Sequence, residues 1–216
     1  MITFINKPSS KSSSVMKPRH NRLDGFRGDY EFIVANEYVG RPYVPEGNRS
    51  GINLDIRVDL ATENHDRVIE IFGPILDNDQ VWACKRCRGI FGDDARLLLN
   101  NDLILQSIEV TPAFAIEIFP LLADNLWRSM CLRWPNILLP ETPGELHTVL
   151  LDLVYDRGPL NKHLHNIDGH IRRKNWLLVA ENIGEMQQRH KDEKVRERRK
   201  MESEYLLAAL GDTPSA

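Results

Sequence analysis

The chain has 216 residues, of which 27% are charged and 42% hydrophobic, and its formal net charge is −3 at pH 7. This composition is typical of a globular protein with one sizeable domain and a tail. Because the net charge is slightly negative, the chain lacks the positive electrostatic field that would attract a nucleic acid. No nucleic-acid partner is therefore predicted. No apolar run reaches the ~20 residues that cross a bilayer, so no membrane insertion is predicted either.

Residues 1–24 are rich in Ser, Lys and Pro, which predicts a flexible polar tail before a domain over 25–212. The tail has no apolar core of a secretory signal, so we expect synthesis in the cytoplasm without a standard signal peptide. Cys84 and Cys87 have the spacing of a metal-binding pair, and Cys131 is the third cysteine. A zinc site needs further ligands, so two thiols on a helix are favoured, and no metal or cofactor is predicted.

The first predicted helix covers residues 28–38, in the sequence GDYEFIVANEY. Asp29 is suited to cap its N-terminus, and an apolar face at helical spacing ends on Glu37. We therefore expect Glu37 on the apolar side of this helix. Residues 39–51 are rich in Gly, Pro, Asn and Ser, which predicts a loop or hairpin.

Residues 51–60 have the sequence GINLDIRVDL, in which apolar and polar residues alternate strictly. Such alternation predicts a half-buried strand. Its polar face carries Asn53, Asp55, Arg57 and Asp59. Asn53 and Asp59 are about 20 Å apart along a straight strand, so they can share a site only if the segment turns between them.

The rest of the chain has the pattern of helices, expected over about 62–76, 93–110, 111–134, 141–158, 160–190 and 192–210. The segment 111–134 opens with Thr and Pro, and Pro120 is expected to kink or divide it. Gly158 is a natural helix end, and the segment 160–190 is expected to break near 169–175. This order predicts an α+β fold, mostly α, with a small hairpin lobe at about 28–62 and a helical lobe at about 63–212.

Two carboxylates flank the predicted strand. Glu37 closes the apolar side of a helix, where burial raises the pKa of a carboxyl group and keeps a proton available. Asp59 lies on the polar edge, as an ionised partner. A protonated acid near an ionised one is the pair that glycoside hydrolysis uses.

From Glu37 to Asp59 the layout resembles the phage-type lysozymes, and most of all their pesticin-like branch. In that branch a helix ends in a catalytic Glu, and a Tyr-Val-Pro loop and a Gly-Val-Thr-Ile-Gly-x-Gly-x-Asp-Leu-Gly stretch follow. This chain has RPYVPEGNRSG at 41–51 and GINLDIRVDLA at 51–61. Later segments are similar to three further helices of the family: TVLLDLVYDRG (148–158), NWLLVAENIGEM (175–186) and RERRKMESEYLLA (196–208). The resemblance implies a lysozyme-like fold.

The resemblance also implies catalytic roles. Glu37 would be the general acid and Asp59 the general base. Glu46, the carboxylate of the loop before the strand, is the reserve candidate for the base. Asn53 stands where the family has the Thr that orients the attacking water.

The predicted active-site strand diverges from the family at two more positions. Asp55 and Arg57 replace two glycines that keep the floor of the family's cleft bare beside the sugar. We expect Asp55 and Arg57 to pair with each other or with Asp59. Together with Tyr43 they are the predicted substrate-binding residues.

The implied function is that of a muramidase, which hydrolyses, with inversion, the β-1,4 bond between N-acetylmuramic acid and N-acetylglucosamine in peptidoglycan. As a bacteriolytic toxin or an endolysin, the protein would need a secretion system or a holin to reach the periplasm and cell wall. Its partners would be the glycan strand, an immunity protein or a component of the secretion machinery. A catalytically inactive lysozyme-like module that binds glycan or a partner protein is the alternative, and a helical adaptor without a glycan ligand is a third.

Overall fold

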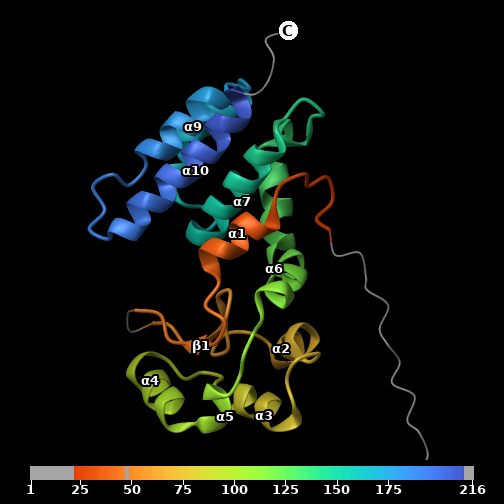
Figure 1. Cartoon of the computed structure of the whole chain (residues 1–216), viewed down its shortest axis with the longest axis vertical. Helices are drawn as coiled ribbons and strands as arrows, with labels where there is room; N and C mark the ends of the chain where they lie inside the picture. The colour runs from red at the N-terminus through yellow and green to blue at the C-terminus, as the bar shows by residue number, and fades with distance from the viewer. Residues whose placement is uncertain (1–21, 47–48, 212–216) are drawn as a thin grey trace, which may run out of the picture.

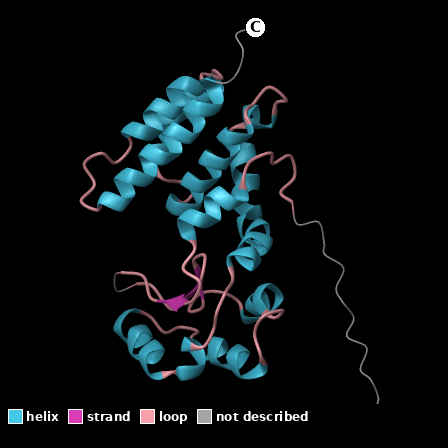
Figure 2. Ribbon diagram, viewed as in Figure 1, coloured by secondary structure: helices cyan, strands magenta, loops and turns pink. Residues whose placement is uncertain are grey.

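The computed structural model describes residues 22–46 and 49–211. Of the tail predicted over 1–24, residues 1–21 lie outside the described residues. The described chain is mostly helical with a three-stranded antiparallel sheet, which confirms the α+β class, mostly α (Figure 2). The elements are α1 (Tyr30–Glu37), β1 (Pro42–Tyr43), β2 (Asn53–Leu54), β3 (Val58–Asp59), α2 (His65–Phe72), α3 (Asn78–Arg86), α4 (Gly92–Asn101), α5 (Leu103–Gln106), α6 (Pro112–Arg133), η1 (Pro135–Leu138), α7 (Gly144–Arg157), η2 (Lys162–Leu164), α8 (His165–Arg172), α9 (Trp176–Glu185) and α10 (Glu193–Gly211), where η marks a 3-10 helix.

Several helix ends follow the expected local chemistry. The Asp29 side chain accepts hydrogen bonds from two backbone N–H groups at the start of α1. The Thr111 side chain accepts one, from Phe114, at the start of α6, which begins at Pro112. Gly158 ends α7 with a φ of 82°, a left-handed conformation that glycine adopts readily. The break expected near 169–175 falls between α8 and α9.

Pro120 does not divide its helix, contrary to one of the two outcomes expected. α6 is one helix of 22 residues with Pro120 inside it and buried. A proline removes one backbone hydrogen bond from a helix interior. Here α6 packs against both α1 and α7, and this burial outweighs the lost hydrogen bond.

The predicted strand over 51–60 is wrong in its length, because the segment forms a tight hairpin. β2 and β3 are two-residue strands that pair antiparallel, with Asn53 opposite Asp59. Asp55 and Arg57, in the turn between them, have left-handed φ angles of 49° and 62°. The polar face of the predicted half-buried strand is also wrong in part, because two of its four side chains are buried. Asn53 is 4% exposed and Asp55 0%.

Figure 1 shows two halves. The upper half contains α1 and α6 to α10, and the lower half contains the sheet with α2 to α5. Backbone hydrogen bonds tie the later part of the lower half to the sheet region, for example from Gly89 N to Ala61 O and from Gly92 N to Ser50 O, both of 2.9 Å. A hairpin lobe and a helical lobe were expected to meet near residue 62. In the structure, the helices that directly follow this residue lie in the same half as the sheet (Figure 1).

The described chain begins on the surface of the upper half. Leu23 is buried, and its backbone N–H donates to the Tyr30 hydroxyl. The indole N–H of Trp127 donates to the carbonyl of Asp24 at 2.7 Å. Residues 23 and 24, predicted to belong to the tail, are therefore attached to the domain.

Within the described residues, no helix is both long and apolar enough to cross a membrane.

Candidate active site

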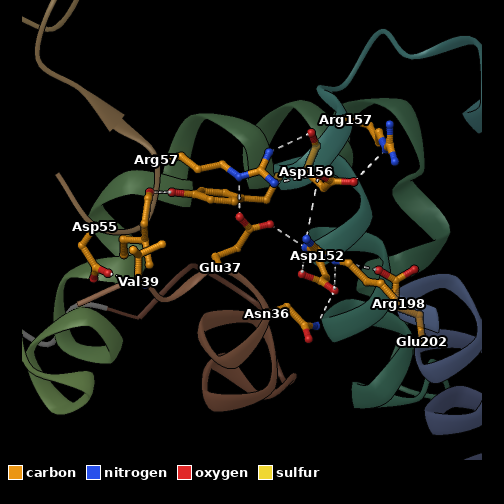
Figure 3. Close-up of polar contacts among 12 residues, drawn as sticks. Asn36, Glu37, Val39, Asp55, Arg57, Asp152, Asp156, Arg157, Arg198 and Glu202 are labelled. Carbon is orange, nitrogen blue, oxygen red and sulfur yellow. Dashed lines mark hydrogen bonds and ion pairs between the residues drawn. The ribbon is translucent and has the colours of Figure 1, made fainter. Parts of the chain in front are cut away.

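Glu37 is the last residue of α1, and its side chain is 2% exposed. One carboxylate oxygen accepts a hydrogen bond of 2.6 Å from Nη2 of Arg198 on α10, and the other pairs with Nε of Arg57 in the hairpin turn (Figure 3). Burial raises the pKa of Glu37, while Arg198 and Arg57 act against that rise. The result is a desolvated carboxyl group with a raised pKa, as the sequence predicts for this residue.

Two carboxylates of α7 extend this network (Figure 3). Asp152, which is fully buried, accepts hydrogen bonds from Asn36 at 2.9 Å and from Arg198 at 2.5 Å. Asp156 pairs with Arg57 at 2.8 Å. Burial alone would raise the pKa of Asp156, but the surrounding arginines, Arg198 first, lower it below the ordinary value. The arginines therefore favour the ionised form of Asp156.

A second layer of the network lies on α10 itself. Arg199 and Glu202 are both fully buried and pair at 2.9 Å, and burial raises the pKa of Glu202 well above its ordinary value. Arg199 also reaches Asp156 at 3.3 Å. This layer fixes α10 against α7 and so places Arg198 beside Glu37.

The segment does turn between Asn53 and Asp59 and so brings them together, but both side chains bond to their own hairpin. The two carboxylate oxygens of Asp59 accept from the backbone N–H groups of Ala61 at 2.8 Å and Gly51 at 3.3 Å. The amide of Asn53 contacts the carbonyl of Gly51 at 3.4 Å. These contacts fix the shape of the hairpin and hold the side chain of Asp59 within it.

The expected pairing of Asp55 and Arg57 with each other or with Asp59 is wrong. One oxygen of Asp55 accepts from the backbone N–H groups of Val39 at 2.9 Å and Gly40 at 2.8 Å, so it anchors the loop after α1 (Figure 3). Arg57 turns the other way, toward Glu37 and Asp156. The left-handed backbone at both positions directs the two side chains to different partners.

Tyr43 lies near the same cluster, whereas Glu46 lies at the surface. Burial raises the pKa of the Tyr43 hydroxyl, and the charges of Arg57 and Glu37 also act on it. Tyr43 lines a groove of about 720 Å³ together with Arg41. Glu46 is exposed, next to residues 47–48 that the structure does not describe.

A second groove, of about 470 Å³, runs beside Glu37. Asn36, Arg57, Asp156 and Arg198 are among the residues that line it. Arg57 thus stands at the edge of this groove and contacts Glu37 directly. Glu37 itself does not line the groove, and its two partners Arg57 and Arg198 do.

Sequence reasoning missed Asp152, Asp156 and Arg198. A signal for the first existed, since Asp152 interrupts the apolar run TVLLDLVY, and a carboxylate inside a buried helix is seldom found without a partner. Asp156 follows four residues later, on the same helix face. Arg198 is 161 residues from Glu37, and local patterns do not reveal such a contact.

Cys84 and Cys87 occur at the end of α3 and just after it, as free and buried thiols. Burial raises the pKa of each to about 12, so neither is a reactive thiolate at neutral pH.

Comparison with protein-family models and with curated proteins finds no match for this chain.

Proposed function

We propose that the protein is a lysozyme-type glycoside hydrolase that cleaves the β-1,4 bond between N-acetylmuramic acid and N-acetylglucosamine in peptidoglycan. The observation that carries this proposal is the position of Glu37. It is a desolvated carboxyl group with a raised pKa, at the end of α1, facing the turn of a hairpin that pairs Asn53 with Asp59. A buried acid of raised pKa is what protonation of a glycosidic oxygen requires.

The backbone of the hairpin supports the resemblance to the pesticin-like lysozymes. Asp55 and Arg57 stand where that family has glycines, and both adopt left-handed φ angles that glycine favours. Gly51 matches another family glycine, and a Cβ at this position would collide with Ala61 and Asp59. The same backbone therefore suits the family's sequence, and we propose that the two halves form a lysozyme-like fold.

In the proposed reaction, Glu37 donates its proton to the glycosidic oxygen as the bond from that oxygen to the anomeric carbon of N-acetylmuramic acid breaks. Water attacks the same carbon from the opposite face and gives its proton to a carboxylate, and the configuration inverts. Asp59 is the proposed base, with Asn53 holding the water, and Glu46 is the reserve. Asp59 or Glu46 would have to leave its resting position to reach the water.

The setting of the proposed reaction is the bacterial cell wall. Peptidoglycan glycan is the proposed partner, and an immunity protein or a secretion component is a further one. Delivery to the periplasm would use a secretion system or a holin.

A second candidate function is a lysozyme-like module that binds glycan or a protein without cutting. The observation in its favour is that both oxygens of Glu37 are held by guanidinium groups, from Arg57 and Arg198. A carboxylate held in this way has no proton to donate. Binding of a glycan strand without release of reducing ends would establish this alternative.

The test of the proposed function is the release of reducing ends from purified peptidoglycan. We expect release by the wild-type protein and a loss of about 100-fold or more in Glu37→Gln, because general acid catalysis contributes at least that factor. Glu141→Gln is the control, since it removes an exposed carboxylate that pairs with Lys174 far from the site. Asp59→Asn and Glu46→Gln assign the base. No release from any peptidoglycan type would contradict the proposal.

A further inference from the structure

The hairpin turn carries a side chain that bridges the two halves of the molecule directly over Glu37. Arg57 belongs to the lower half, and its guanidinium pairs with Glu37 on α1 and with the carboxylate of Asp156 on α7, both in the upper half (Figures 1 and 3). It also donates to the carbonyl of Asp156 at 3.1 Å. One side chain therefore makes three contacts across the junction.

Two other residues attach the same turn. The Tyr155 hydroxyl donates to the carbonyl of Ile56 at 2.6 Å, and Asp55 holds the backbone of Val39 and Gly40. Asp55 is fully buried and Tyr155 partly buried, whereas 39% of the Arg57 side chain is exposed. Arg57 is therefore the attachment that a ligand from solvent can displace while the turn stays anchored.

The backbone of Arg57 is held in an unfavourable conformation. Its φ of 62° is rare for a residue with a long side chain, whereas glycine adopts such a backbone readily. Such strain persists where surrounding contacts over-determine the conformation, and the three contacts of Arg57 do so here. Arg57 thus supplies an ionic contact with Glu37 but places a long side chain on a backbone conformation that is unfavourable for it.

We propose that Arg57 is a latch that closes the approach to Glu37 in the free protein and is displaced when a glycan strand enters the groove beside it. This inference rests on the proposed function and concerns the regulation of the same site. In the closed state Arg57 pairs with the Glu37 carboxylate and separates it from the groove that Asn36 and Arg198 also line. In the open state the hairpin turn remains attached through Tyr155 and Asp55, and the Glu37 carboxyl group faces the groove.

The experiment compares Arg57→Gly with the wild-type protein. Glycine fits the left-handed backbone, so the variant is expected to fold. Lys174→Gly is a matched control, because Lys174 also has a left-handed φ, of 56°, and also pairs with a carboxylate, Glu141, at 2.7 Å. Arg57→Lys keeps the charge but lacks the planar fork that contacts two partners, and an intermediate result is expected.

Two readouts separate the latch from the proposed function. Hydrogen exchange of the amides in residues 51–61 is expected to be about tenfold faster in Arg57→Gly than in the wild-type protein, and unchanged in Lys174→Gly. Reducing-end release per enzyme at low peptidoglycan concentration is expected to rise several-fold in Arg57→Gly. Unchanged exchange, or release that falls in Arg57→Gly, would overturn the latch. No release by any of the four proteins would instead overturn the proposed function.

Discussion

The environment of Glu37 combines two opposing influences on one carboxyl group. Burial favours its protonated form, and the guanidinium groups of Arg57 and Arg198 favour its ionised form. Because Arg198 is held in place by Asp152, its effect on Glu37 is fixed, whereas Arg57 reaches Glu37 from the surface. Burial is the largest of these influences and Arg198 the next, so displacement of Arg57 would remove only part of the positive charge that favours the ionised form.

Asp55 provides a test of the contacts that shape the turn. Asp55→Ala removes the acceptor of two backbone N–H groups, those of Val39 and Gly40, and places alanine at a left-handed φ. We expect the free energy of unfolding to fall by about 2 kcal/mol, since hydrogen bonds to a charged group are worth roughly that amount. Denaturant unfolding measures the change.

Asp55→Asn is the matched control for this prediction. Asparagine keeps a side-chain oxygen for the same two N–H groups and tolerates a left-handed φ. We expect a loss of less than about 1 kcal/mol. Equal losses in the two variants would show that the hydrogen bonds do not stabilise the turn.

At the scale of elements, the helices were largely predictable and the hairpin was not. Asp29, Thr111 and Gly158 mark helix ends through their local chemistry, which sequence displays directly. The alternation over 51–60 predicts one long strand. Asp tolerates a left-handed backbone but Arg rarely adopts one, so the residue types at 55 and 57 do not outweigh the alternating pattern. The turn follows from contacts with α1 and α7 that local sequence does not contain.

The candidate site was also predictable only in part. The pattern places Glu37 on the apolar side of α1, and the structure buries it there. It places Asn53 and Asp59 about 20 Å apart on one strand, whereas the hairpin of the structure sets them opposite each other. The partners of Glu37 come from elements far along the chain, so only the folded arrangement brings them together.

Gly51 tests the packing of the hairpin. A Cβ at this position would collide with Ala61 and Asp59 and would lie 3.2 Å from the carbonyl oxygen of Ile90. We expect Gly51→Ala to lower the free energy of unfolding by about 2 kcal/mol, since overpacking a filled site costs about 1–3 kcal/mol. Thermal or denaturant unfolding measures the loss.

The control for Gly51→Ala is Gly211→Ala, at the last residue of α10. A Cβ there meets no atom within 4 Å, so the expected change is within about 0.5 kcal/mol. A Gly51→Ala variant as stable as this control would mean that the hairpin packs less tightly than the structure shows.

In the molecule as a whole, the charged side chains of the candidate site meet at the junction of the two halves. α1, α7 and α10 of the upper half supply Glu37, Asp156 and Arg198, and the lower half supplies Arg57 (Figure 1). Charged groups from three segments, the hairpin, α7 and α10, meet around the buried carboxyl group of Glu37, next to a groove of about 470 Å³. Such clusters of shifted titratable groups beside a groove occur often at functional sites.

The identity of the new chain ends in digested peptidoglycan shows directly whether Glu37 is the acid of a muramidase. Products would be reduced with borohydride and their terminal sugars identified by mass spectrometry, for the wild-type protein and for Glu37→Gln. We expect reduced N-acetylmuramic acid at the new ends with the wild-type protein and none above background with Glu37→Gln. Reduced N-acetylglucosamine, cleaved stem peptides or equal amounts of product from both proteins would contradict the assignment of Glu37 as the acid of a muramidase.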